Sequence, residues 1–221
     1  MNRNAQHLAA YESVLKDTVP NCHFHQGDVA DYADFCDTLV SAANSRLTFN
    51  GGSDYDYIEI FGNPEQLMNE QLNEFWVDHP GVFGKCETPF LPVGAAMRKR
   101  INDKLFIVAP TMLTPQNVHQ SKNAYHAFKA VLELLDKDPC ASQHVLVPGL
   151  CTGYGKTDAT KSALQVKDAW LDHAAGKRNC HLHTDSPDIV CNTKVLHQQP
   201  HYECNLMYMG ETIGKHKLEH E

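Results

Sequence analysis

Short apolar runs alternate with longer helical patterns over residues 1–175 of the chain. Apolar residues recur at helical spacing in residues 6–16, 64–76, 121–135 and 158–173. Among these stretches lie four runs short enough for β-strands, at residues 22–26, 38–42, 105–109 and 144–147. Alternation of this kind is typical of an α/β fold in which helices cover a largely parallel sheet. The sequence therefore predicts one α/β domain over residues 1–175.

Residues 176–221 form a predicted C-terminal extension, because apolar periodicity weakens there and His and Cys become frequent. The residues of this extension that could bind zinc are Cys180, His181, His183, Cys191, His197, His201 and Cys204. Only the His201 to Cys204 interval matches a standard spacing between zinc ligands. We therefore expect an extension without a metal, with a zinc site as the alternative.

The charge balance excludes some classes of partner. The chain has 27 acidic and 19 basic side chains, and its formal net charge is −8. A protein that binds duplex nucleic acid by neutralising phosphates is expected to carry a positive net charge. Duplex nucleic acid is therefore not an expected partner.

Residues 1–17 contain no apolar core of signal-peptide length, and no later run is long enough to span a membrane. Together with eight cysteines read as reduced thiols, these features predict a cytoplasmic protein with no membrane partner.

Residues 144–158 combine a strand, a glycine-rich loop and the start of a helix. Such a loop directs backbone N–H groups toward an anion at the helix N-terminus, where the helix dipole adds to the attraction. Gly155-Lys156-Thr157 resembles the end of a P-loop, but Leu150 stands where the first P-loop glycine should be. A small phosphate ligand is therefore the favoured interpretation, and a glycine-rich turn without a ligand is the alternative.

A second glycine loop favours the ligand over the empty turn. Residues 39–54 again follow a strand, carry Gly51 and Gly52, and lead into a helical pattern near Asp54. Two strand-loop-helix units can face each other at the carboxyl ends of parallel strands, where α/β folds usually bind ligands. We therefore predict a diphosphate held between the two loops.

Four ordered motifs in this sequence resemble those of macro domains. They are Gly27-Asp28-Val29, residues 40–44 (VSAAN), residues 50–54 (NGGSD) and residues 148–155 (PGLCTGYG). Residues 93–96 and 105–111 stand where that family has a strand pair, and the resemblance covers residues 22–174. It implies a three-layer α/β/α macro-type fold with a mixed, largely parallel sheet. It also implies ADP-ribose as the ligand, with no cofactor and no metal.

The resemblance assigns binding roles along the ligand. Asp28, followed by Val29, would accept a hydrogen bond from the adenine amino group, and Asn44 would bind hydroxyls of the distal ribose. The remaining ligand-binding residues would come from the two loops, and they are Asn50, Gly51, Gly52, Gly149, Cys151, Thr152, Gly153, Tyr154 and Gly155. From the residues alone, Asp28 is equally a turn or cap residue, Asn44 an Asn in a left-handed turn, and Tyr154 an exposed loop aromatic.

Asp54 is the predicted catalytic residue. In hydrolytic macro domains an acidic residue after the glycines lies beside the distal ribose, where it can orient or deprotonate a water. Asp54 is also a suitable residue for the start of a helix over residues 55–61. Ser41 and Ser53 depart from the family pattern, in which Asn and an aliphatic residue are usual. Cys151 is considered as a nucleophile, but no partner His is identifiable, so it is interpreted as a small loop residue.

Three functions follow as hypotheses. The first is hydrolysis of ADP-ribose 1″-phosphate, O-acyl-ADP-ribose or ADP-ribosylated targets through Asp54. The second is a non-catalytic module that recognises ADP-ribose. The third is an interaction protein that acts through its C-terminal extension and uses the macro-like core only as a scaffold.

Overall fold

The computed structural model describes residues 1–83, 88–139, 142–178, 186–192, 206–208 and 211–213. Its centre is a five-stranded sheet in the order β4-β1-β3-β2-β5. The strands are β1 (Thr38–Ser41), β2 (Ala95–Ile101), β3 (Lys104–Val108), β4 (Val145–Leu146) and β5 (Ile189–Cys191). Strand β1 pairs in parallel with β3 and β4, whereas β2 pairs antiparallel with β3 and β5. The sheet is therefore mixed, with a parallel half that includes the strands leading into both predicted loops.

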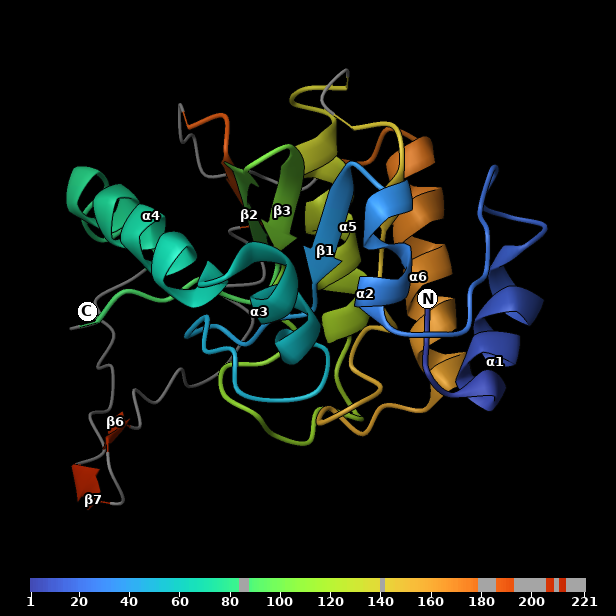
Figure 1. The fold of residues 1–221 in the computed structure, drawn as a ribbon, viewed down its shortest axis with the longest axis horizontal. Helices are drawn as coiled ribbons and strands as arrows, with labels where there is room; N and C mark the ends of the chain where they lie inside the picture. The colour runs from blue at the N-terminus through green and yellow to red at the C-terminus, as the bar shows by residue number, and fades with distance from the viewer. Residues whose placement is uncertain (84–87, 140–141, 179–185, 193–205, 209–210, 214–221) are drawn as a thin grey trace.

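Helices cover both faces of the sheet (Figure 1). The helices are α1 (Ala5–Leu15), α2 (Val29–Tyr32), α3 (Asp54–Phe61), α4 (Pro64–Asp78), α5 (Asn123–Leu135), α6 (Ala159–Ala174) and the short 3-10 helix η1 (Ala33–Phe35). Helices α2, α3 and α4 lie on one face, and α5 lies on the other face with α6 and then α1 beside it. The predicted three-layer α/β/α arrangement is confirmed.

Alternation along the strands produces two cores, one on each face of the sheet. Leu39 and Phe106 point to the face covered by α2, α3 and α4, where Tyr57 is fully buried. Val40 and Ile107 point to the opposite face and pack with α5. Because neighbouring residues of a strand face opposite sides, a buried β1 and β3 must be apolar on both faces. This explains why apolar residues follow one another at Leu39 and Val40 in β1 and from Leu105 to Val108 in β3.

The predicted strand at residues 22–26 is wrong. This segment contains no regular strand and forms only an isolated parallel bridge between Gln26 and Asn2. Its apolar residue Phe24 packs against the cluster that contains Leu15 and Val166. Burial of one side chain therefore accounts for the alternating pattern without a ladder of hydrogen bonds. The other three predicted strands and all five predicted helices, including the one over residues 55–61, are present, with ends shifted by up to two residues.

Part of the predicted C-terminal extension belongs to the sheet. Strand β5 lies beyond residue 176 and pairs with β2 through residues Ala95 to Met97. Cys191 is buried in β5, and burial raises the pKa of its thiol far above the ordinary value. The other six candidate zinc ligands lie outside the described residues. A separate pair of strands, β6 (Leu206–Tyr208) and β7 (Glu211–Ile213), is antiparallel.

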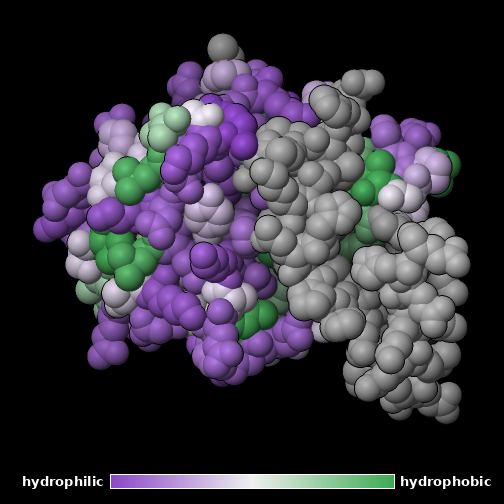
Figure 2. Space-filling model, turned by 180° about the vertical axis from the view of Figure 1, so that it is seen from behind, coloured by the Kyte–Doolittle hydropathy of each residue, from purple (hydrophilic) through white to green (hydrophobic). Residues whose placement is uncertain are grey.

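The surface carries mainly polar side chains on the face seen in Figure 2, and its apolar residues occur in small separate groups. Scattered apolar residues of this kind are normal on a protein surface. Within the described parts of the chain, no helix combines the length and apolar character needed to cross a membrane.

Candidate functional site

The two glycine loops meet at one edge of the sheet. Because β1 is parallel to β3 and β4, the carboxyl ends of all three strands lie at this edge. The first loop follows β1, and the second loop follows β4 and leads into α6. A bridge between Asn44 and Met112 continues the pairing of β1 with β3 into the loop region. The arrangement places the predicted binding residues where parallel sheets usually hold ligands.

Asn44 organises the first loop. Its side-chain nitrogen donates to the carbonyl oxygen and to the hydroxyl of Thr48, both at 2.8 Å, and its oxygen accepts from the Arg46 N–H at 3.0 Å. The residue is buried. These bonds fold residues 44–48 into a compact turn that presents the following residues at the edge of the sheet. Binding of ribose hydroxyls by Asn44 stays a prediction.

Asp54 is the first residue of α3, and its carboxylate reaches back to the glycine loop. It accepts hydrogen bonds from the N–H of Gly51, at 3.3 Å, and from the N–H of Asn50. Burial raises the pKa of Asp54 to about 6, the negative charge of Glu65 adds to the rise, and the two N–H groups oppose it. A carboxylate that changes protonation state near neutral pH is well suited to general base catalysis.

Glu65 is a feature of the site that sequence reasoning missed. It lies in the first turn of α4, and its side chain accepts a hydrogen bond from the Phe49 N–H at 2.8 Å. This bond ties the first loop to a second helix. An acidic residue in the first turn after Pro64 is a common helix-start feature, so its position alone gave no reason to connect it with the loop.

The second loop is closed by its own backbone. The Thr157 N–H donates to the Cys151 carbonyl at 3.0 Å, and the Lys156 N–H donates to the Gly153 carbonyl at 3.1 Å. A Cβ at Gly155 would lie 2.5 Å from the Cys151 carbonyl oxygen, so the close turn requires glycine there. The loop ends at Asp158, whose side chain accepts from the Lys161 N–H and caps α6.

Cys151 is a poor nucleophile in this structure. Its side chain is buried, and burial raises the pKa of its thiol to about 12. Because the thiolate is the reactive form, a raised pKa leaves the thiol unreactive at neutral pH. The geometry supports the interpretation of Cys151 as a loop residue.

Tyr154 connects the two loops. The residue is 62% exposed, and its ring lies close to Gly51. A Cβ at Gly51 would lie 3.1 Å from both a ring carbon and the hydroxyl oxygen of Tyr154. The two loops therefore approach each other closely, and a side chain at position 51 would require the tyrosine ring to shift by a few tenths of an ångström.

Asp28 and Val29 begin α2, beside the start of α3. The Asp28 carboxylate forms an ion pair with the Arg3 guanidinium, and the Val29 N–H donates to the Asp56 carboxylate at 3.3 Å. Arg3 also pairs with Asp56. Neither Arg3 nor Asp56 was identified from the sequence, because they are separated from Asp28 by 25 residues or more along the chain.

Comparison with known proteins establishes the fold. No protein-family model matches the sequence, and a search of curated proteins finds no match. Among solved structures, the macrodomain of Mycobacterium tuberculosis DarG superposes with a TM-score of 0.52 at 12% identity, over 67% of this chain and 89% of that chain. This chain has the macrodomain fold.

Two further solved structures agree. The Oceanobacillus iheyensis macrodomain with ADP gives a TM-score of 0.50 at 14% identity, over 66% of this chain and 72% of that one. Thermosipho africanus DarTG in complex with ADP-ribose gives a TM-score of 0.50 at 14% identity, over 66% of this chain and 37% of that one. The macrodomain fold therefore accounts for about two thirds of the chain.

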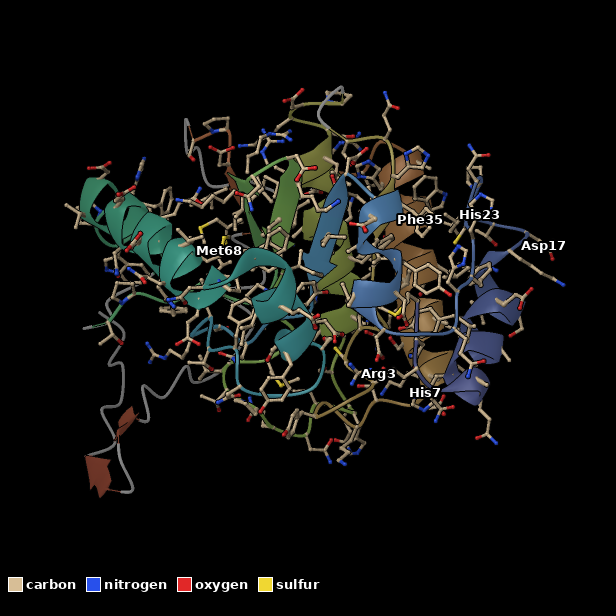
Figure 3. The ribbon with its side chains drawn as sticks, viewed as in Figure 1. Arg3, His7, Asp17, His23, Phe35 and Met68 are labelled. Atoms are coloured by element: carbon tan, nitrogen blue, oxygen red, sulfur yellow. The ribbon has the colours of Figure 1, made fainter. Side chains whose placement is uncertain are left out.

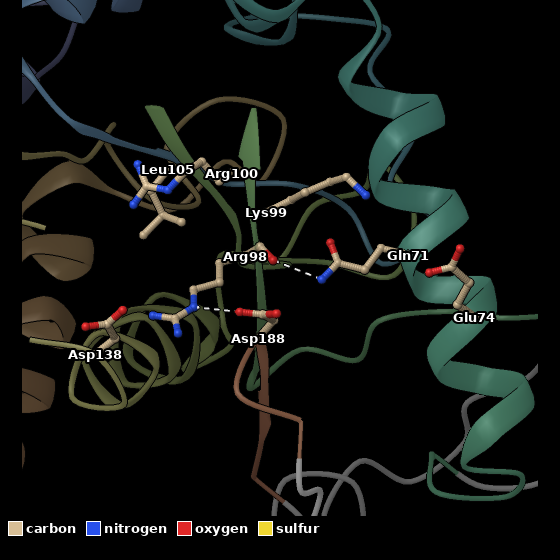
Figure 4. Close-up of a pocket in the computed structure, with 8 residues that line it drawn as sticks. All are labelled: Gln71, Glu74, Arg98, Lys99, Arg100, Leu105, Asp138 and Asp188. Carbon is tan, nitrogen blue, oxygen red and sulfur yellow. Dashed lines mark hydrogen bonds and ion pairs between the residues drawn. The ribbon is translucent and has the colours of Figure 1, made fainter. Parts of the chain in front are cut away.

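A cavity of about 380 Å³ lies at the other end of the macrodomain sheet (Figure 4). It is lined by Arg98 and Arg100 of β2, by Leu105 near the start of β3, and by charged or polar residues of neighbouring segments. Arg98 is buried and pairs with Asp188 at 3.0 Å, and Gln71 donates to the Arg98 carbonyl. Since the glycine loops follow the carboxyl ends of β1 and β4, this cavity is separate from the candidate site.

Proposed function

We propose that this protein binds ADP-ribose between its two glycine loops and hydrolyses a bond at the distal ribose. The observation that carries the proposal is the meeting of the loops at the carboxyl edge of the sheet, with the Asp54 carboxylate against the first loop. The macrodomain fold supports it, because two similar structures are described as complexes with ADP and with ADP-ribose. No cofactor and no metal enter the proposal.

Backbone groups of the loops would hold the diphosphate. Helix α6 has 16 residues and starts directly after the second loop, so its positive N-terminal end would add to the attraction for the diphosphate. Gly51 and Gly52 would let the first loop approach from the other side. This mode of binding does not depend on net charge, and it is compatible with a chain whose net charge is −8.

The two ends of the ligand would meet different residues. Asp28 and Val29 would recognise the adenine base, because a carboxylate accepts a hydrogen bond from an amino group. Asn44 would bind the distal ribose, and the exposed ring of Tyr154 would cover it. The ligand would then run from α2 across both loops toward Asp54.

Hydrolysis would use Asp54 as the general base. The carboxylate would take a proton from a water as that water attacks the anomeric carbon or its substituent, and the bond to the leaving group would break. The substrates would be ADP-ribose 1″-phosphate, O-acyl-ADP-ribose or ADP-ribosylated macromolecules. With a pKa of about 6, Asp54 is mainly ionised at pH 7 and above, as a base requires.

The second candidate is a reader that binds ADP-ribose without hydrolysis. One observation favours it: the Asp54 carboxylate accepts from the N–H of Gly51 and of Asn50. In that arrangement Asp54 stabilises the loop and the start of α3. Measured turnover separates the two functions.

Calorimetry with ADP-ribose, AMP and ATP tests the proposed binding. We expect micromolar affinity for ADP-ribose, which corresponds to about −8 kcal/mol. AMP should bind much more weakly, because it lacks the second phosphate and the distal sugar. Absence of ADP-ribose binding would contradict both the hydrolase and the reader.

A further inference from the structure

Arg3 joins two carboxylates at the start of α2. Its Nη2 donates to both oxygens of Asp56, at 3.0 and 3.1 Å, and its Nε donates to the Asp28 carboxylate. The Asp56 side chain is only 11% exposed, whereas that of Asp28 is 43% exposed. One guanidinium therefore neutralises a nearly buried carboxylate and at the same time holds an accessible one.

The backbone next to Arg3 is fixed to the same part of the molecule. The Asn2 N–H donates to the His25 carbonyl at 3.1 Å, and the Gly27 N–H donates to the Asn2 carbonyl at 3.3 Å. The Asn2 side chain also packs against Gly149 of the second loop. Figure 3 shows Arg3 beside α2, at the end of the molecule where the loops lie. Arg3 thus belongs to a segment that is hydrogen-bonded to residues 25–27 and lies beside the second loop.

The arrangement has an electrostatic consequence. Asp56 also accepts from the Val29 N–H, so Asp28, Val29 and Asp56 form one connected group around the guanidinium. Burial raises the pKa of Asp56, and the positive charge of Arg3 opposes that rise. Without Arg3, two carboxylates would face each other across the start of α2, and their repulsion would favour displacement of the more exposed one. The accessible partner, Asp28, would then lose the guanidinium that holds its carboxylate on this side, and keep its backbone bond to the Asp31 carboxylate.

We propose that Arg3 is a specificity-determining residue for the base of the ligand. By holding the Asp28 carboxylate in a fixed orientation, it makes this end of the site accept a base that carries an amino group and reject a base that carries a carbonyl oxygen at the same position. Arg3 acts through Asp28 and is a positioning residue for the reaction. This inference rests on the proposed function, since it assumes that ADP-ribose occupies the site.

The test compares ADP-ribose with its inosine analogue, in which a carbonyl replaces the adenine amino group. Calorimetry is carried out on the full chain and on three variants: Arg3→Ala, Arg3→Lys and the control Arg178→Ala. Arg178 is a surface residue of similar exposure that pairs with Asp136 at 2.9 Å, away from the loops. Thermal unfolding of each variant checks that it is folded.

The parent protein and Arg178→Ala should bind ADP-ribose at least about tenfold more tightly than the inosine analogue. This difference is the usual effect of one hydrogen bond to a charged group. In Arg3→Ala this preference should fall to within about threefold, mainly through weaker ADP-ribose binding. Lysine keeps the charge but cannot reach both carboxylates with a rigid fork, so Arg3→Lys should recover part of the affinity and little of the preference.

The possible results distinguish the role of Arg3 from the proposed function. An unchanged preference in Arg3→Ala, tighter binding of ADP-ribose, or an equal loss for both ligands would overturn the role of Arg3 while leaving the proposed function intact. If Arg3→Ala does not fold, Arg3→Lys decides the question: a preference for ADP-ribose as large as that of the parent protein would overturn the role of Arg3. A parent protein that binds neither ligand would overturn the proposed function, and this inference with it.

Discussion

Tyr154 lies against the backbone of Gly51, so the two glycine loops are in contact across the site. The contact is close enough that a Cβ at position 51 would come within 3.1 Å of the tyrosine hydroxyl. The loops are therefore coupled: a change in one alters the position of the side chain that the other presents to the ligand.

The first prediction follows from this contact. Gly51→Ala should weaken ADP-ribose binding, because the added methyl group pushes the Tyr154 ring away from its place over the first loop. The loss should be smaller when Tyr154 is already alanine, since there is then no ring to displace. Calorimetry on the two single variants and on the double variant should give a coupling energy of about 1 kcal/mol. Strictly additive losses would show that the contact is unimportant for binding.

The second prediction concerns catalysis by Asp54. Asp54→Asn keeps a hydrogen-bond acceptor for the loop N–H groups but removes the base, so turnover of ADP-ribose 1″-phosphate or an O-acyl ester should fall by about 10² or more. Affinity for ADP-ribose should change little, because backbone groups hold the diphosphate. That combination indicates a role in the transition state. Unchanged turnover would place the base elsewhere, and a parent without turnover would be a reader.

The third prediction is the pH dependence of that turnover. The pKa of Asp54 is raised, to about 6, so the protonated form is favoured by the fold and persists to higher pH than for an ordinary Asp. Since the base must be ionised, kcat/KM should decline as pH falls through about 6 and level off above about 7. A pH profile from 4.5 to 8.5, measured with a substrate that does not titrate in this range, checks it. A decline centred near pH 4 would contradict a raised pKa for Asp54 in its half-buried position.

The fourth prediction compares the contributions of two tyrosine hydroxyls of α3 to stability. The Tyr57 hydroxyl is fully buried and donates to the Val40 carbonyl at 2.5 Å, whereas Tyr55 is 63% exposed. Tyr57→Phe should lower the free energy of unfolding by about 1 kcal/mol, because it removes a buried hydrogen bond and leaves the carbonyl without that donor. The matched variant Tyr55→Phe should be nearly neutral. Urea unfolding measures both, and equal effects would argue against a specific role for the buried bond.

Sequence patterns predicted those parts of the fold that depend on local burial. Helix α5 and strand β3 were predicted nearly to the residue, because each buries apolar side chains in a regular pattern that neighbouring residues reveal. Strand β5 was missed. It has only three residues, and its pairing with β2 joins segments more than 90 residues apart. No pattern within three residues can reveal such a partner.

The same distinction applies to the candidate site. Motifs at residues 50–54 and 148–155 indicated two loops at one edge, and the structure brings them together. The bonds of Arg3 to Asp28 and Asp56 could not be predicted, because ion pairs between segments 25 and 53 residues apart leave no local pattern. The strand expected at residues 22–26 shows the opposite error: the pattern was present, but among the described residues the segment pairs only with Asn2, through one isolated bridge.

The position of β5 has a practical consequence for work with fragments. A fragment that ends at the predicted boundary, residue 175, would lack the strand that pairs with residues Ala95 to Met97. The N–H and carbonyl groups of that part of β2 would then be open to other chains, and unpaired strand edges promote aggregation. Poor behaviour of such a fragment would say nothing about ligand binding. A fragment that extends through Asn192 keeps the edge covered, because the Asn192 N–H also bonds to the Gly94 carbonyl.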